Sequence, residues 1–236
     1  MNKFQVITEP DSEAAAAESG EYLNQILSIN LKKPVLLMLS AGSALSLLNY
    51  VGKTALGENL TVSMLDERFT MDPKVNNFSK MQKTDFYQDA LDSEVSFFGS
   101  LPRAGETKEE LANRWQTNLQ NWRTENPKGL IIASLGMGAD GHTSGITPMA
   151  DESTFNHLFS NHDWIKAYTA ENQEYKERVT ATLTFLKMID IALALVCGND
   201  KKPKLQEVIK KQGSVNTLPA LAWHGIKEVR VFTDIK

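Results

Sequence analysis

The sequence predicts an α/β protein, a three-layer αβα sandwich built around a mostly parallel sheet. The continuous apolar run Val35–Leu39 is typical of a strand buried on both faces, and the largely apolar segment Leu130–Leu135 indicates another strand. Between such runs, apolar residues recur at helical spacing, as they do from Lys108 to Trp122. Strands that alternate with helices pair in parallel through right-handed crossovers, so these observations together indicate one sheet covered on both faces.

The individual elements follow in chain order. Asp11 or Ser12 can cap a first helix, which the alanines at 14–17 favour. Gly42–Ser43 opens a second helix, whose expected inner face carries Leu45, Leu48 and Val51. The expected helices run from 11 or 12 to about 29, onward from 42, and over 76–87, 108–122 and 204–211. The expected strands are Val35–Leu39, Leu60–Leu65, Val95–Phe98, Leu130–Leu135, Arg178–Leu183, Ile189–Cys197 and Glu228–Phe232.

Length and composition favour a single globular domain over residues 1–236. Hydrophobic residues make up 42% of the chain and charged residues 23%, which is enough apolar material for a core. The formal net charge of -4 argues against nucleic acid or an anionic membrane as a partner. If the substrate is an anion, its positive contacts must be local. We expect a small-molecule substrate and a monomer or weak homodimer.

The cysteine count and the N-terminus limit the other classes. Cys197 is the single cysteine, so no internal disulfide can form, and no Cys/His pattern has zinc spacing. We therefore expect no metal. The N-terminus lacks the apolar segment of a signal peptide, and the most apolar stretch, 34–51, is broken by polar residues. The expected location is the cytoplasm.

Three polar segments each follow a predicted strand: 40–43, 66–68 and 136–142. In open α/β sheets, the carboxyl ends of the strands border the ligand crevice, so we expect these segments to meet there. In the first segment, Ser40, Gly42 and Ser43 offer hydroxyls and backbone N–H groups at a helix start, which suits a phosphate; the alternative is an ordinary capped turn.

The second segment, Asp66-Glu67-Arg68, contributes a planar guanidinium that suits phosphate or carboxylate, although a solvated charge cluster has the same pattern. Arg178 at a strand start and Lys201 after a short turn are two further cations that can point into the crevice. For these the alternatives are a strand-end charge and a solvated lysine.

The third segment, Gly136-Met137-Gly138-Ala139-Asp140-Gly141-His142, carries the strongest functional signal. Its three glycines allow a tight turn and can present N–H donors to an anion, with Gly138 at the centre. The ordinary pKa of histidine, about 6.5, makes His142 suitable for proton transfer at neutral pH. Asp140 either orients His142 or forms the turn. The spacing is not the Gly-x-Gly-x-x-Gly of dinucleotide-binding loops, and no helix clearly follows.

On these residues the chain resembles the 6-phosphogluconolactonase family, within the fold superfamily of glucosamine-6-phosphate deaminase and ribose-5-phosphate isomerase. The family pattern Leu-Gly-x-Gly-x-Asp-Gly-His-Thr-Ala-Ser-Leu-Phe-Pro matches residues 135–148. Asp66-Glu67-Arg68, Arg178-Val179-Thr180 and Gly198 with Lys201 match further family segments in order, from about Val35 to Asp234.

Two departures from the family pattern stand out. The first loop has Ala41 and Ala44 where the family pattern Ser-Gly-Gly-Ser-Thr-Pro has a glycine and a threonine, which bears on phosphate binding. Further along, Gly145-Ile146-Thr147 stands where the family pattern has Ser-Leu-Phe. The related deaminases carry a glutamate five residues after the loop histidine, where this chain has Thr147, and that difference favours the lactonases.

The resemblance implies hydrolysis of 6-phospho-D-glucono-1,5-lactone to 6-phospho-D-gluconate without a metal or cofactor. His142 would be the general base, Asp140 its possible orienting group, and Arg68 or a loop N–H near Gly138 the oxyanion donor. The implied substrate and phosphate contacts are Ser40, Gly42, Ser43, Gly138, Arg178 and Lys201. The alternatives are an aminosugar-phosphate isomerase or deaminase, and a non-catalytic sugar-phosphate sensor.

Overall fold

A seven-stranded parallel sheet forms the centre of the molecule in the computed structural model, which describes residues 3–171 and 173–236. All six strand pairings are parallel, as predicted. Across the sheet the strands are β1 (Lys3–Thr8), β10 (Glu228–Thr233), β9 (Ile191–Leu195), β6 (Leu130–Gly136), β2 (Val35–Leu39), β3 (Leu60–Met64) and β5 (Ser96–Phe98). Residues 1, 2 and 172 of the predicted domain lie outside the described residues.

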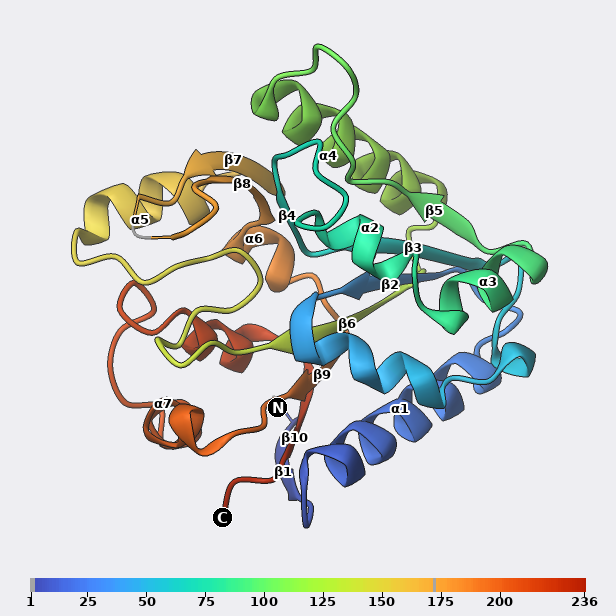
Figure 1. Cartoon of the computed structure of the whole chain (residues 1–236), viewed down its shortest axis with the longest axis horizontal. Coiled ribbons are helices and arrows are strands. Elements are labelled where there is room, and N and C mark those ends of the chain that lie inside the picture. Colours follow the sequence, from blue (N-terminus) through green and yellow to red (C-terminus); the bar gives the residue numbers. More distant parts are fainter. Residues whose placement is uncertain (1–2, 172) are drawn as a thin grey trace.

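Helices cover both faces of this sheet, which confirms the three-layer prediction. Helix α1 (Ser12–Ile29) is capped by Asp11, whose carboxylate accepts from the Ala14 N–H, and it packs on β9 and β10. Next to it lies the 3-10 helix η1 (Gly42–Tyr50). Figure 1 shows α1 on one side of the sheet and α7 (Lys202–Ile209) on the other. Every residue of β2 and β3 is buried, because both faces of these central strands are covered, and β2 is apolar throughout.

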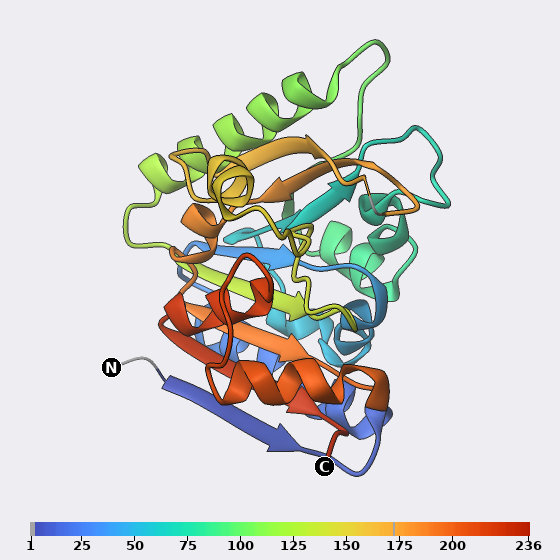
Figure 2. The same cartoon turned by 90° about the vertical axis from the view of Figure 1, so that its left-hand side faces the viewer.

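A second, antiparallel sheet was not predicted. It consists of β4 (Asp66–Arg68), β8 (Glu177–Ala181) and β7 (Ile165–Thr169), and α4 (Lys108–Glu125) packs against β7 and β8. Figure 2 shows α4 and this sheet at the opposite end of the molecule from β1. The polar triplet 66–68 looked like a loop in the sequence because its strand partner is more than a hundred residues away.

Several predicted boundaries need correction. The helix expected over 76–87 is two helices, α2 (Asn77–Met81) and α3 (Asp85–Asp92), because Thr84 caps the second one. The strand expected to run from Arg178 to Leu183 ends at Ala181, since Thr182 caps the short helix α6 (Leu183–Leu186). In η1, Leu48 is buried as predicted, as is Val51 directly after it, but Leu45 is only half-buried and Leu47 is buried instead. The remaining elements are η2 (Lys53–Ala55), α5 (Glu152–Phe159), η3 (Asn199–Lys201) and η4 (Pro219–Gly225); β1, α5 and β7 had no sequence prediction.

The order of the strands fixes where a ligand can bind. From β2 the chain proceeds to β3 and β5 on one side, and from β6 it proceeds to β9 and β10 on the other. The loops after β2 and β6 therefore leave neighbouring strand ends in opposite directions, which opens a crevice between them. The Ser40 N–H donates to the Ser134 carbonyl at 3.0 Å and holds the two strand ends together. Among residues 3–171 and 173–236, no helix has both the length and the apolar composition to cross a bilayer.

Candidate active site

A cavity of about 240 Å³ lies at this crevice, and all three of the polar segments identified in the sequence reach it. Its lining residues are Ser40, Ala41, Gly42, Ser43, Asp66, Arg68, Asn77, Gly136, Met137, His142, Ser144, Gln173 and Arg178. The second sheet supplies the arginines, and the loops after β2 and β6 supply the serines, the glycines and His142. Sequence reasoning had not singled out Gln173 or Ser144.

The glycine-rich loop is closed by its own hydrogen bonds. The Gly138 N–H donates to the His142 carbonyl, and the Gly141 N–H donates to the Gly138 carbonyl, both at 3.0 Å. A Cβ on Gly138 would lie 2.2 Å from the His142 ring, so this position requires glycine. Gly138 is not among the lining residues, and its N–H is already engaged. Gly138 therefore shapes the loop, and its own N–H is not free to act as an oxyanion donor in this conformation; a role for neighbouring loop N–H groups stays a prediction.

Asp140 both forms the turn and orients His142, so the two roles left open by the sequence coincide. Its Oδ1 accepts from the His142 backbone N–H at 3.0 Å and lies 2.6 Å from the ring Nδ1. Partial burial works to raise the pKa of Asp140, but the hydrogen bond and charge of His142 outweigh it, and the pKa lies below its ordinary value. An ionised Asp140 favours the tautomer with a proton on Nδ1, which leaves Nε2 as the basic nitrogen.

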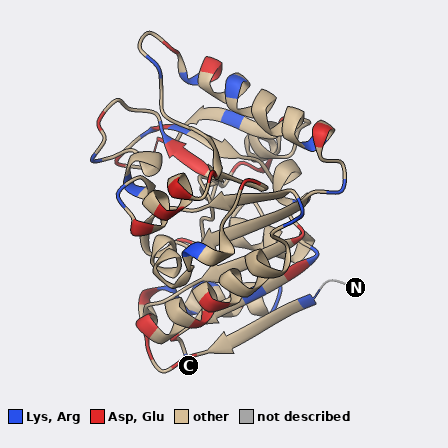
Figure 3. Ribbon diagram, turned by 90° about the vertical axis from the view of Figure 1, so that its right-hand side faces the viewer, with Lys and Arg blue, Asp and Glu red and all other residues tan. Residues whose placement is uncertain are grey.

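Two arginines lie side by side on neighbouring strands of the second sheet. Arg68 on β4 is paired in register with Arg178 on β8, a like-charge pair that destabilises the sheet unless something compensates it. The Arg68 guanidinium lies 5.2 Å from the centre of the Tyr175 ring, and the Tyr175 carbonyl accepts from Arg178 Nε at 2.9 Å. Figure 3 shows acidic and basic residues mixed over one face of the molecule. Arg68 and Arg178 are instead two positive charges side by side, which suits an anion.

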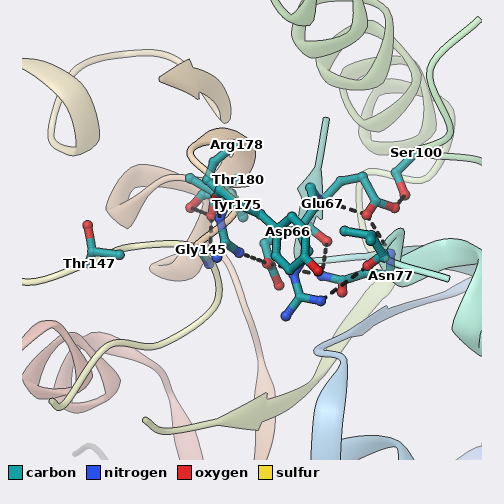
Figure 4. A network of polar contacts seen from close by, with 12 residues as sticks. Asp66, Glu67, Asn77, Ser100, Gly145, Thr147, Tyr175, Arg178 and Thr180 are labelled. Atoms are coloured by element: carbon teal, nitrogen blue, oxygen red, sulfur yellow. Dashed lines mark hydrogen bonds and ion pairs between the residues drawn. The ribbon is translucent and has the colours of Figure 1, made fainter. Parts of the chain in front are cut away.

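The buried carboxylate of Asp66 lies beside these arginines. Its Oδ2 is 3.6 Å from Arg178 Nη1 and accepts from Asn77 Nδ2 at 3.1 Å. Figure 4 shows Asp66 between Arg178 and Asn77. Burial raises the pKa of Asp66, while the charges of Arg178, Arg68 and His142 work against that rise. Asp66 thereby holds Arg178 in place and offsets part of the positive charge in the cavity.

Glu67 points away from the cavity and anchors its wall. The side chain is fully buried and accepts four hydrogen bonds, from Ser100 Oγ at 2.8 Å and from the N–H groups of Arg68 at 2.8 Å, Asn77 at 2.6 Å and Phe78 at 2.9 Å. This carboxylate therefore ties β4 to the start of α2 and fixes two residues of the cavity wall. Nothing in the sequence distinguished it from an exposed acid. Burial raises the pKa of Glu67 to about 7, although the hydrogen bonds it accepts work to lower it.

This elevated pKa predicts a pH-dependent stability. The folded protein keeps Glu67 protonated up to about pH 7, whereas the unfolded chain loses this proton near pH 4.5. Ionising Glu67 therefore takes more free energy in the folded protein, and the free energy of unfolding falls as pH rises from 4.5 to about 7. The contribution is about 3 kcal/mol over that window. Glu67→Gln should be less stable overall but should lose less stability between pH 5 and pH 8, as urea unfolding can measure. Equal losses in both proteins would contradict the assignment.

The cavity also concentrates polar atoms that lack partners. Among the described residues, seven buried side-chain nitrogen or oxygen atoms make no hydrogen bond, and four of them belong to residues that line this cavity. These are Ser40 Oγ, Arg68 Nε, Asn77 Oδ1 and Ser144 Oγ. Each such atom costs about 1–3 kcal/mol when it is left unpaired. A polar ligand that supplies both donors and acceptors would satisfy them.

Lys201 lies outside this cavity, unlike the two arginines. It ends η3, and the segment before it is fixed by the Gly198 N–H, which donates to Asp234 Oδ1 at 2.9 Å. Gly198 has a φ of 102°, so the chain turns sharply there. Within the described part of the chain, no group of three or more His, Cys, Asp or Glu side chains is placed to hold a metal ion.

A family model and solved structures match this chain over nearly its whole length. Residues 10–231 match the family model for glucosamine-6-phosphate isomerases/6-phosphogluconolactonase. A search of curated proteins found no match. A 6-phosphogluconolactonase structure from Shewanella baltica OS155 is 18% identical, with a TM-score of 0.78 over 99% of this chain and 97% of that one. The Trypanosoma brucei 6-phosphogluconolactonase is 16% identical, with a TM-score of 0.74 over 99% and 97%.

Proposed function

The chain belongs to the glucosamine-6-phosphate isomerase/6-phosphogluconolactonase family, and from that premise we propose that it hydrolyses 6-phospho-D-glucono-1,5-lactone to 6-phospho-D-gluconate, the second step of the oxidative pentose phosphate pathway. One observation carries the proposal: His142, held by Asp140, shares a cavity with the paired arginines Arg68 and Arg178. The cavity therefore combines a base with an anion site, as a phosphorylated lactone requires. Solved structures of the same fold from Shewanella baltica OS155 and Trypanosoma brucei are named 6-phosphogluconolactonases, which supports the same substrate.

His142 is the general base. Its Nε2 takes a proton from water while the water oxygen bonds to C1 of the lactone, giving a tetrahedral intermediate with a negative oxygen. When that intermediate collapses, the bond between C1 and the ring oxygen breaks, and the imidazolium returns the proton to the departing oxygen. The acid product then ionises in solvent. Asp140 stabilises the transient imidazolium through Nδ1.

The arginines and the first loop bind the charged groups. Arg68 is the oxyanion donor, because it lines the cavity and its buried Nε has no partner within the protein, whereas the Gly138 N–H is already used within its loop. The phosphate lies against Arg178 and the Ser40–Ser43 segment, where Gly42 leaves open space above its Cα. Lys201 does not line the cavity, so its predicted contact to the phosphate stays a prediction outside this arrangement.

The position of Thr147 argues against the isomerase or deaminase alternative. Thr147 occupies the place of the deaminase glutamate, and its hydroxyl lies 3.3 Å from the Tyr168 hydroxyl rather than in the cavity lining. Figure 4 shows Thr147 well apart from the network around Asp66. Asp66 is the carboxylate that does line the cavity, and it is engaged with Arg178 and Asn77.

A panel of three compounds tests the proposed activity. Freshly generated 6-phosphogluconolactone should be hydrolysed far faster than unphosphorylated gluconolactone at equal low concentration, and glucosamine 6-phosphate should release no ammonia. The phosphate preference follows from Arg178 and the Ser40–Ser43 segment, which bind the phosphate in this arrangement. Ammonia release from glucosamine 6-phosphate would favour the deaminase alternative, and binding without turnover of any compound would favour the sensor.

The role of Asp140 gives a separate prediction. Asp140→Asn should lower kcat by at least about tenfold, or roughly 1.4 kcal/mol, because the amide stabilises neither the tautomer nor the imidazolium. KM should change little, since Asp140 itself is not among the lining residues. In a His142→Ala background the same substitution should have no further effect, because the two residues act as a unit. An additive loss would show that Asp140 acts independently of His142.

A further inference from the structure

Ser144, on the same loop as His142, has a strained backbone conformation and a buried hydroxyl without a hydrogen bond. Its φ is 53°, in the left-handed region that non-glycine residues seldom adopt. Its Oγ is buried without a hydrogen-bond partner, although the residue lines the cavity with His142. Strain and unsatisfied polar groups of this kind persist at functional sites, where binding or catalysis uses them.

The neighbouring residue explains how the hydroxyl is fixed. Gly145 packs so closely that a Cβ there would lie 2.8 Å from the Thr180 Cβ and 3.0 Å from the Asp66 Cβ. Its N–H donates to Thr180 Oγ1 at 3.0 Å, and its carbonyl accepts from the Tyr168 hydroxyl. The second sheet thus clamps the chain directly after Ser144, and the serine cannot relax into an ordinary backbone conformation without breaking these contacts.

We propose that Ser144 is a substrate-binding residue, whose hydroxyl hydrogen-bonds an oxygen of the bound sugar phosphate. This assignment rests on the proposed function and extends it to a residue outside the family pattern, which has alanine at this position. The same chain lacks the hydroxyl that the pattern places at Ala44 in the first loop. Ser144 supplies a hydroxyl to the cavity from the other loop, and its Oγ has no competing partner within the protein.

The test compares Ser144→Ala with Ser19→Ala. Ser19 Oγ is also buried and unpartnered, but it lies on α1 and outside the cavity lining, so it is a matched control. Ser144→Ala should raise KM for 6-phosphogluconolactone about 3- to 10-fold, as expected for one lost hydrogen bond, and should leave the melting temperature unchanged or higher. Ser144→Gly removes the same hydroxyl while tolerating the positive φ, and it should show the same rise in KM.

The outcomes separate this assignment from the function on which it rests. Wild-type hydrolysis with an unchanged KM in both Ser144 variants overturns the assignment alone. A lower melting temperature at unchanged KM also overturns it, since the role would then be structural. Absence of wild-type hydrolysis overturns the proposed function and the assignment together. If inhibition by inorganic phosphate weakens in Ser144→Ala alongside the KM rise, the contact is to the phosphate; unchanged inhibition places it on the sugar.

Discussion

Replacing His142 with alanine should lower kcat for lactone hydrolysis by about 10²- to 10⁴-fold, equivalent to roughly 3–5 kcal/mol. Asp140 holds the His142 ring through Nδ1, and replacing His142 removes the imidazole that this contact positions as the base. KM should stay within a few-fold, because the charged contacts to the phosphate come from other residues. The measurement is steady-state hydrolysis coupled to 6-phosphogluconate dehydrogenase, with the spontaneous opening of the lactone subtracted.

His157→Ala is the matched control for this experiment. His157 is exposed on α5, outside the cavity lining, and its replacement should change neither constant. A His142→Ala enzyme with near-wild-type kcat would show that another group activates water. A large rise in KM with unchanged kcat would instead assign His142 to substrate binding.

The second large effect is expected at Arg178. Arg178→Gln should raise KM about 10- to 100-fold with kcat kept within a few-fold, because a charge-assisted contact to phosphate is worth about 1.5–3 kcal/mol and lies far from C1. The substitution also removes the cation 3.6 Å from Asp66, so the pKa of that carboxyl should rise further. Steady-state kinetics and competitive inhibition by inorganic phosphate measure the effect.

Arg103→Gln controls for the loss of positive charge, because Arg103 is exposed and outside the cavity lining. It should leave KM unchanged. If Arg178→Gln lowers kcat while KM stays constant, Arg178 acts at the reacting carbonyl and the two arginines exchange the roles proposed above.

The sequence predicted the central sheet well because its strands carry a strong signal. The residues of β2 and β3 are buried along their whole length; β2 is a continuous apolar run with sharp ends, and β3 has an apolar residue at every second position. Helix α4 was equally clear, since Trp115 and Leu119 are fully buried at helical spacing. The edge strand β1 was missed because most of its residues are exposed and alternate weakly.

The site was predicted only where its residues follow those strands. His142 and the Ser40–Ser43 segment come directly after strands whose ends were evident, and the structure brings them to one cavity. The pairing of Arg68 with Arg178 depends on a second sheet between distant short segments, and such register leaves no local pattern. The anchoring role of Glu67 likewise depends on α2 and on Ser100, which only tertiary structure brings together.

The rate of 6-phosphogluconate formation from freshly generated 6-phosphogluconolactone, with and without the wild-type protein, tests the central claim most directly. We predict a rate above the spontaneous opening that increases linearly with protein concentration and is lost in His142→Ala. A wild-type rate equal to that of buffer would contradict the proposed activity. A rate above buffer that survives in His142→Ala would contradict the role of His142.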